Sequence, residues 1–269
     1  MNARPQQTFA PAPVTARTWP RRPDAFSRAL TADDEQSLLR EWLPKLRLVR
    51  DISHVRYLAY RIAHIEAVCA GRLAGDLADA VLRCLALQAA PGPKLNLLEI
   101  GTLFGVNAVA MYDVALSYFE QVSLTLIDPL DGYYGRGTLD PATGLLVSER
   151  LLRRNLALNS VPSQDVRIVA ARSDGPEALH AVEDQQYGLA FIDGDHSYEG
   201  ARLDCKRFLP HVMPDGIVVF DNYRDGTSPG VDRLVDELTL DPRLGFVAAG
   251  WRTAIFQKRQ EARFADAQA

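Results

Sequence analysis

From Leu95 onward, short apolar runs alternate with longer amphipathic segments, and this alternation limits the fold more than any other feature of the sequence. The runs predict strands over residues 95–100, 122–127, 166–169, 189–192, 217–220, 246–249 and 253–256. The segments between them predict helices over about 106–119, 145–158, 175–183, 198–208 and 230–238. Repeated strand–helix units indicate a parallel sheet with helices on both faces. Because no helix separates the last two runs, we expect a closing hairpin that adds an antiparallel edge.

Three helices are expected before the first strand. The first begins at Thr31, whose hydroxyl precedes acids in the first turn, the second follows Ser53, and the third covers roughly 76–88. Residues 1–30 are rich in proline and arginine and contain a single acid, a composition that cannot bury enough apolar surface to fold. We therefore expect a disordered tail over 1–30, a helical cap over 31–94 and the sheet domain over 95–269. A transit peptide is an alternative interpretation of the tail.

The composition is that of an ordinary globular protein, with 47% hydrophobic and 24% charged residues. A formal net charge of -4 gives no basic field that would recruit nucleic acid, and no apolar run approaches the roughly 18 residues of a membrane span. Cys69, Cys84 and Cys205 lack metal-type spacing and are expected as buried thiols in a reducing cytoplasm. We expect a cytoplasmic protein that has neither nucleic acid nor a membrane as partner.

Polar residues, most of them acids, recur where the predicted strands end. They are Glu99, Asp128, Ser173 with Asp174, Asp193, and Asp221 with Asn222. In an open parallel sheet, ligands bind outside the carboxyl ends of the strands, near the point where the strand order reverses. The sequence therefore predicts the functional site at this edge of the sheet.

The loop after the first strand runs from Gly101 to Gly105 and has two glycines. Gly101 suits a tight turn with positive φ, and Gly105 allows the following helix to approach closely. A dinucleotide fingerprint requires a third glycine between them, and Leu103 stands at that position, which weakens a pyrophosphate interpretation. Asp128 is placed to accept hydrogen bonds from two ribose hydroxyls, although a helix cap explains it equally well.

Four motifs together resemble those of class I S-adenosylmethionine-dependent methyltransferases. They are Glu99-x-Gly101-x-x-x-Gly105, Asp128 after the second strand, the segment FIDGDHSYEG over 191–200, and PDGIVVFDN over 214–222. More narrowly, they resemble metal-dependent small-molecule O-methyltransferases, with the macrocin and sugar subgroup most similar in DGDHSYEG. The resemblance covers about residues 95–257. It implies a Rossmann-like, doubly wound, seven-stranded sheet, mostly parallel with an antiparallel last strand, next to the N-terminal helical cap.

The resemblance also implies site residues. For S-adenosylmethionine these are Glu99, Gly101, Thr102, Gly105, Asp128, Ser173 and Asp193. A divalent metal is implied at Asp193, Asp221 and Asn222, and their oxygen ligands suit a hard cation such as Mg²⁺. Carboxylates that cap helices without any metal remain the alternative interpretation. The neutral Asn222 stands where related sugar enzymes often have a second Asp.

Methyl transfer to a hydroxyl needs a base, and the sequence offers two neighbouring candidates. His196 is the first choice because neutral imidazole accepts a proton near pH 7, and Asp195 is the second. A helix cap, or a partner that orients Asp193, is the structural alternative for His196. The glycine-rich segment 131–137, with Tyr133 and Tyr134, is expected as a lid or as an ordinary exposed turn.

These observations favour an enzyme that transfers a methyl group from S-adenosylmethionine to a hydroxyl of a small molecule, of sugar or polyketide type, with help from Mg²⁺. A homo-oligomer is expected. Two other classes stay open. One is a nicotinamide-dependent oxidoreductase on a similar sheet, and the other is a non-catalytic module that binds a cofactor-sized ligand.

Overall fold

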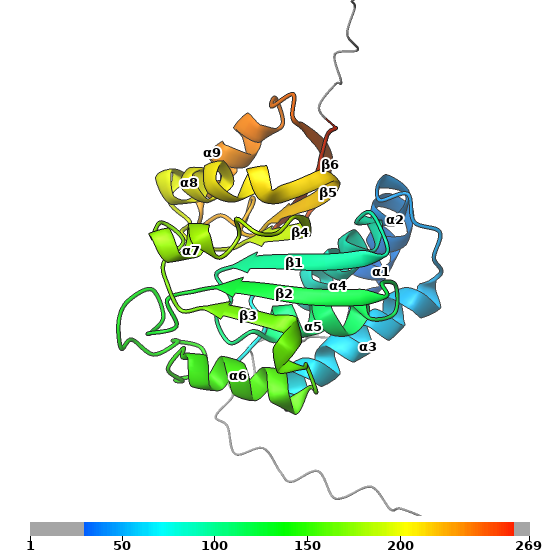
Figure 1. Ribbon diagram of the computed structural model, residues 1–269. Helices are drawn as coiled ribbons and strands as arrows, with labels where there is room; N and C mark the ends of the chain where they lie inside the picture. Colours follow the sequence, from blue (N-terminus) through cyan, green and yellow to red (C-terminus); the bar gives the residue numbers. More distant parts are fainter. Residues whose placement is uncertain (1–29, 261–269) are drawn as a thin grey trace, which may run out of the picture.

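The computed structural model describes residues 30–260, and its elements follow the expected alternation (Figure 1). The strands are β1 (Lys94–Ile100), β2 (Gln121–Ile127), β3 (Val166–Val169), β4 (Tyr187–Ile192), β5 (Val212–Phe220), β6 (Leu244–Gly250) and β7 (Thr253–Lys258). The helices of the sheet region are α5 (Val106–Ala115), α6 (Glu149–Leu158), α7 (Pro176–His180), α8 (Tyr198–Phe208) and α9 (Pro229–Leu238). Before β1 come α1 (Ala32–Ser37), a π-helical stretch (Leu38–Trp42), α2 (Leu43–Lys45), α3 (Ile52–Val68) and α4 (Leu77–Ala86). The expected tail lies, apart from Leu30, outside the described residues.

The seven strands form one sheet in the order β3-β2-β1-β4-β5-β7-β6. Strands β1 to β5 are parallel to one another, and β7 is antiparallel to both β5 and β6. The predicted antiparallel last strand is confirmed. It does not lie at the edge, however, because β7 inserts between β5 and β6 and leaves β6 outermost. The strand order reverses between β1 and β4, which is where this class of sheet places its ligands.

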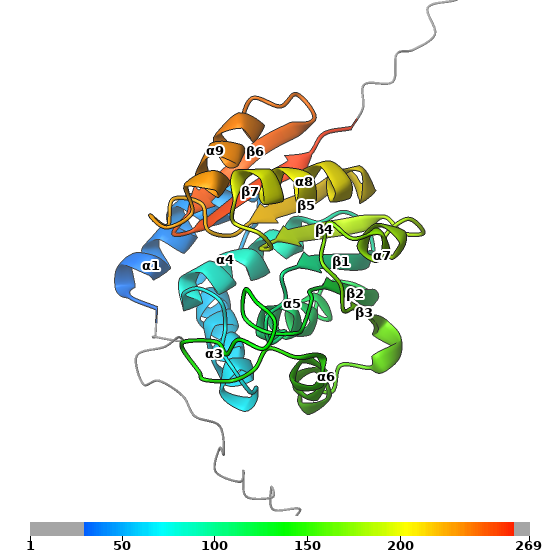
Figure 2. The ribbon, with the colours of Figure 1, turned by 90° about the vertical axis from the view of Figure 1, so that its left-hand side faces the viewer.

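Strand residues alternate between two apolar layers, except at the register shifts between Tyr187 and Leu189 and between Phe246 and Ala248. Leu97, Phe191 and Val219 belong to the core on one face, whereas Leu98, Ile192 and Phe220 belong to the core on the other. Helices α7, α8 and α9 cover the second face, and α3 to α6 lie on the first (Figure 2). This period of two along each strand explains why nearly every position is apolar, since both faces of a parallel sheet are covered.

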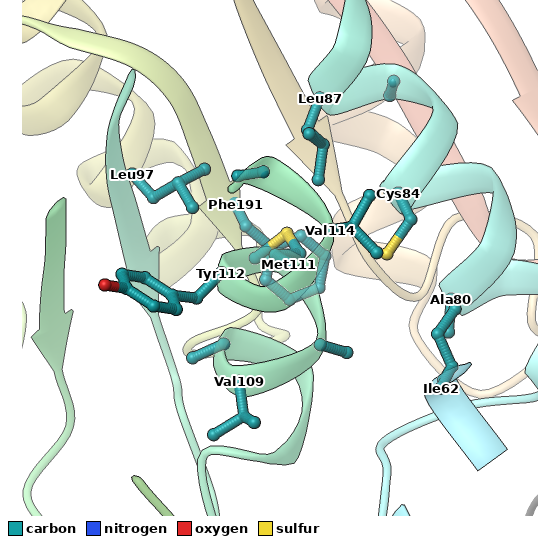
Figure 3. Packing of buried hydrophobic residues seen from close by; sticks show 14 of the residues in the cluster. Ile62, Ala80, Cys84, Leu87, Leu97, Val109, Met111, Tyr112, Val114 and Phe191 are labelled. Atoms are coloured by element: carbon teal, nitrogen blue, oxygen red, sulfur yellow. The ribbon is translucent and has the colours of Figure 1, made fainter. Parts of the chain in front are cut away.

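The N-terminal helices share a core with the sheet. Side chains of α5, including Met111 and Val114, lie between the sheet residues Leu97 and Phe191 and two residues at the end of the helical region, Cys84 of α4 and Leu87 directly after α4 (Figure 3). All of them belong to one continuous apolar cluster. The helical region before β1 is therefore packed against the first face of the sheet through α5.

Local sequence signals account for most helix ends. The side chain of Thr31 accepts from the Asp34 amide at 3.1 Å, and the Asp34 carboxylate accepts from the Thr31 amide at 2.9 Å, so the expected cap of α1 is present. Strand β5 begins five residues earlier than the apolar run indicates, because Val212 pairs with Tyr187 across a register shift that accommodates Pro214 and Gly216.

Two further expectations bear on the chemistry. Cys69, Cys84 and Cys205 are all buried and free. Between residues 30 and 260, no helix has the length and the apolar character needed to cross a membrane.

Candidate active site

The carboxyl ends of the central strands meet at one edge of the sheet. The ladder of hydrogen bonds continues one residue beyond the strands, since Gly101 N–H donates to Ile127 O at 2.9 Å and Asp193 N–H donates to Ile100 O at 2.9 Å. Asp221 N–H likewise donates to Ile192 O at 3.1 Å. The residues that end β1, β4 and β5 are thus in register, which brings the acids of separate motifs together.

A cavity of about 710 Å³ opens at this edge. Seven of the predicted site residues line it: Gly101, Asp128, Ser173, Asp193, Asp195, His196 and Asn222. The other four, Glu99, Thr102, Gly105 and Asp221, lie among its supports rather than in its lining. Residues 131–136 of the β2–α6 connection form another part of the wall.

Both glycines of the first loop have positive φ, which the sequence predicts for Gly101. Gly101 has φ +79°, and a Cβ there would lie 1.9 Å from the carbonyl oxygen of Asp193. Only glycine therefore lets the end of β1 approach the end of β4 so closely. Gly105 has φ +73° and lies against Leu152 of α6.

Asp128 supports the first loop and faces the cavity. One carboxylate oxygen accepts from the amides of Thr102 at 2.9 Å and Leu103 at 3.0 Å, and the other accepts from Leu130 at 2.8 Å. A carboxylate has about four lone-pair sites, so about one remains for a ligand hydroxyl. The Asp128 carboxylate therefore holds the first loop in place and can still accept a hydrogen bond from a ligand hydroxyl.

Glu99 is an internal group. It is 1% exposed, and the Asn107 amide donates to it at 3.4 Å. Burial, together with the nearby charge of Asp193, raises the pKa of Glu99 to about 8. The carboxyl group of Glu99 is therefore neutral at pH 7. Because Glu99 does not line the cavity, it can affect a ligand only through the residues that do.

His196 lies between an acid and a tyrosine of the β2–α6 connection. Its Nε2 is 3.2 Å from Asp193 Oδ1 and 3.0 Å from the Tyr134 hydroxyl, while Nδ1 is 3.3 Å from that hydroxyl. The two rings meet edge-on with centroids 5.5 Å apart. Burial and the nearby charge of Asp221 raise the pKa of Asp193, whereas His196 lowers it. The contact with His196 therefore helps to keep Asp193 ionised.

Asp195 is engaged elsewhere. Its carboxylate accepts from the Ser197 amide at 2.9 Å, directly before α8. A Cβ on Gly200 would lie 2.4 Å from this side chain, so the carboxylate packs against the first turn of α8. Asp195 therefore organises the helix start, whereas His196 is the one of the two that contacts Asp193.

Asp221 does not have the surroundings that the predicted metal site requires. Arg83 Nη2 donates to its Oδ1 at 2.6 Å, and Arg252 donates to Oδ1 at 3.1 Å through Nε and to Oδ2 at 3.3 Å through Nη2. The side chains of Arg83 and Asp221 are both 0% exposed. Within the described residues, no three His, Cys, Asp or Glu side chains are grouped so that they fit a metal ion. The residues present therefore do not fit a divalent cation at Asp193, Asp221 and Asn222.

Asn222 is fixed by the loop that follows it. Its Nδ2 donates to Asp225 at 2.7 Å, which leaves the buried Oδ1 without a hydrogen-bond partner among residues 30–260. Burial opposes ionisation of Asp225, but hydrogen bonds from Asn222, Thr227 and Ser228 outweigh it and lower the pKa of Asp225 to about 2. This carboxylate is thus permanently charged and holds the rim of the cavity.

The arginines at Asp221 were not among the residues that the sequence motifs indicated. Arg83 comes from α4 and Arg252 from the turn between β6 and β7, both far from the motifs in the sequence. One signal was available for Arg83, since it and Asp79 are the two charged residues of an otherwise apolar helix and a buried guanidinium needs an acidic partner. Arg252, in a polar turn, offered no such signal.

Known proteins agree with this architecture. Residues 98–223 match a family model described as a methyltransferase domain. An uncharacterized protein of Sinorhizobium fredii is 28% identical over 131 residues, and one of Acanthamoeba polyphaga mimivirus is 27% identical over 136 residues. The matched segments cover 46% and 49% of this chain but 13% and 61% of those proteins, so the chain spans less than two thirds of either relative.

Solved structures share the fold at low identity. Cofactor-bound Rv0187 from MTB has a TM-score of 0.52 and 19% identity, with 84% of this chain and 94% of that chain covered. The O-methyltransferase NovP has a TM-score of 0.51 and 19% identity, with 75% of this chain and 81% of that chain covered. Residues 98–223 thus match a methyltransferase domain, and the chain shares the fold of these solved structures.

Proposed function

We propose that this protein transfers a methyl group from S-adenosylmethionine to a hydroxyl of a small molecule, of sugar or polyketide type. The observation that carries the proposal is the pair of His196 and Asp193 in the wall of the cavity, directly next to the first loop. A proton acceptor in that position is what an O-methyltransferase needs and what a module that only binds a cofactor does not.

The cofactor end of the cavity is assigned to Gly101, Asp128, Ser173 and Asp193. Their chemistry suits a nucleoside, because Asp128 keeps a lone pair for a ribose hydroxyl while it holds the loop in place. A cavity of about 710 Å³ lies within the ~300–1,000 Å³ of small-molecule sites. When bound, S-adenosylmethionine supplies a methyl group on a sulfonium, which is a good leaving group.

We assign His196 as the base and its Nδ1 as the nitrogen that acts. An ionised Asp193 only accepts, so the hydrogen of the imidazole lies on Nε2, which points to that carboxylate. The lone pair is then on Nδ1. Asp195 is the less suitable base, because its carboxylate is occupied at the start of α8.

The reaction balances with these groups. With S-adenosylmethionine bound, the acceptor oxygen would form a bond to the methyl carbon, the carbon–sulfur bond would break with its electron pair going to sulfur, and the acceptor proton would go to Nδ1 of His196. Asp193 stabilises the imidazolium that results, and Tyr134 helps to exclude water at the ring. The reaction as written needs no oxidant and no further reactant.

Four expectations from the sequence stay predictions. They are the sugar or polyketide type of the acceptor, the homo-oligomer, the cytoplasmic location and the division at residues 30 and 94. The β2–α6 connection, with Tyr133, Tyr134 and Arg136 in the cavity wall, supports a lid that covers the acceptor.

Calorimetric titration of the full chain with S-adenosylmethionine tests the cofactor assignment. We expect one binding site, and in Asp128→Ala a Kd raised about 10- to 100-fold, because a charge-assisted hydrogen bond and the clamp on the loop are lost. Asp184→Ala, at an exposed ion pair with Arg167, is the matched control and keeps the wild-type Kd. Tight binding of NADH without binding of S-adenosylmethionine would overturn the proposal in favour of an oxidoreductase.

A further inference from the structure

Asp221 is held by two cations that belong to the chain itself. Arg83 reaches it from α4 at 2.6 Å, and Arg252 reaches both of its oxygens from the β6–β7 turn at 3.1 and 3.3 Å. The carboxylate has no exposed surface. Its charge is therefore balanced within the protein, at the position where the motifs predict a metal ligand.

Arg83 is fixed on every side. Its Nε donates to Thr253 Oγ1 at 3.3 Å, Nη1 donates to Ala74 O at 3.2 Å, and the guanidinium lies 4.7 Å from the centre of the Phe191 ring. Thr253 in turn donates to Asp79 at 2.9 Å. A divalent cation at Asp221 would have to displace this guanidinium from a fully buried position and leave it without its acid.

Arg252 differs because it also faces the cavity. Its side chain is 30% exposed, it lines the cavity with His196 and Asn222, and its charge acts on Asp193 and His196. Its backbone amide donates to Asp79 at 3.1 Å, which anchors the turn. A guanidinium has five N–H donors, and the two bonds to Asp221 leave about three for a ligand.

We propose that the Arg252 guanidinium, held in place by Asp221 and Arg83, replaces the divalent cation at the acceptor end of the cavity, so that this enzyme needs no metal. The inference rests on the proposed function, since it assigns Arg252 to the acceptor oxygen of that reaction. A guanidinium carries its charge at every physiological pH and donates to a developing alkoxide. Arg83 is the positioning residue, and Asn222 Oδ1, buried and without a partner in the described part of the chain, is left for a second acceptor hydroxyl.

The metal part of the inference is tested with Mn²⁺ alone, on chelator-treated full chain, by electron paramagnetic resonance. We expect no saturable Mn²⁺ binding to the wild type, and the same result for Asp221→Asn. Saturable binding of one Mn²⁺ to the wild type, abolished in Asp221→Asn, overturns the inference. Cooperative thermal unfolding of both proteins shows that the result concerns folded chains.

The arginine part is tested by kinetics in EDTA, with an acceptor identified by mass spectrometry after incubation with S-adenosylmethionine that carries a deuterated methyl group. We expect wild-type turnover to be unchanged by EDTA, and Arg252→Gln to lower kcat about 100-fold while the Kd for S-adenosylmethionine stays the same. Arg252→Lys, which keeps a charge but not the fork of donors, should retain more activity than Arg252→Gln. Arg233→Ala, at an exposed ion pair with Glu237 on α9, is the matched control.

Two results would contradict the arginine part. One is loss of turnover in EDTA with recovery on adding Mg²⁺, and the other is full kcat in Arg252→Gln. Failure of the proposed function looks different, because S-adenosylmethionine would not bind to the wild type. The Mn²⁺ experiment requires neither cofactor nor acceptor, so it still decides the metal question in that case.

Discussion

At the scale of single residues, opposing effects set the pKa of His196. Burial lowers its pKa, but the hydrogen bond and the charge of Asp193 outweigh burial, so the net pKa is raised above the ordinary value. Because the neutral imidazole is the form that accepts a proton, kcat/KM should rise with pH through a pKa above about 6.5. In Asp193→Asn, burial and the charge of Arg252 lower the pKa and only the charge of Asp221 still raises it, so the rising limb should move to lower pH.

The measurement is a pH profile of kcat/KM for both proteins, together with an NMR titration of the histidine rings that needs no turnover. Exposed His180, which pairs with Glu183 away from the cavity, is the internal control, and its ring signals should be the same in wild type and variant. A rising limb at the same pH in both proteins would show that Asp193 does not tune His196.

Glu99 offers a second test, of stability rather than activity. Its folded-state pKa of about 8 lies above the 4.5 of a free glutamate, so the folded chain keeps a proton that the unfolded chain releases. The wild type therefore loses stability as pH rises from 4.5 to 8. Glu99→Gln imitates the neutral carboxyl, and its free energy of unfolding relative to wild type should increase by up to about 1.4 kcal/mol per pH unit in that range.

Urea unfolding of both proteins at several pH values measures this difference. Glu120→Gln, at an exposed residue before β2, provides the matched control and should show no trend with pH. A flat difference for Glu99→Gln would mean that Glu99 is ionised in the folded protein at neutral pH.

At the scale of elements, the β2–α6 connection forms part of the cavity wall and is the proposed lid. Gly132 has φ +145°, and a Cβ there would lie 2.0 Å from the carbonyl oxygen of Gly135, whereas Gly137 has φ +75° and open space around it. In Gly132→Ala the turn must change and Tyr134 is displaced from His196, so we expect kcat/KM to fall about 100-fold. In Gly137→Ala the only cost is the positive φ of the residue, so kcat/KM should fall far less.

Steady-state kinetics of these two alanine variants checks the lid assignment. Equal losses in both would indicate that the connection acts only through its general flexibility. Unchanged kinetics in Gly132→Ala would show that the connection does not cover the acceptor.

The strands and helices also show how much of the fold can be predicted from the sequence. Each predicted strand is present, because a covered parallel sheet requires continuous apolar runs that end at turn residues. The apolar runs of β6 and β7 do not show that β7 lies between β5 and β6, because the strand order depends on which edge of β5 is open. Helix α5 ends at Ala115 rather than near 119, where apolar residues continue into the turn.

The same distinction holds for the site. Gly101, Asp128, Asp193, His196 and Asn222 are predictable because strand ends in one sheet share an edge. The partners of Asp221 are not, because Arg83 lies 138 residues and Arg252 31 residues away in the sequence. Only tertiary packing of α4 and the β6–β7 turn shows that this acid is paired with arginine.

At the scale of the whole molecule, the N-terminal helices and the sheet depend on each other. Helix α4 supplies Arg83 to Asp221, and its apolar side chains share one cluster with α5 and the sheet. A chain that begins at Lys94 would expose that cluster and leave Asp221 with Arg252 alone. We expect it to show no cooperative thermal unfolding by circular dichroism, whereas a chain that begins at Leu30 keeps every contact described here and should unfold cooperatively. Cooperative unfolding of the shorter chain would mean that the sheet region folds independently.

Methyl transfer itself is tested most directly by mass spectrometry of hydroxylated small molecules incubated with the full chain and S-adenosylmethionine that carries a deuterated methyl group. The account predicts a product that gains one labelled methyl on oxygen, forms in EDTA as well as with Mg²⁺, and is lost in His196→Ala. Label that appears on nitrogen or carbon, or product formation that persists unchanged in His196→Ala, would contradict it.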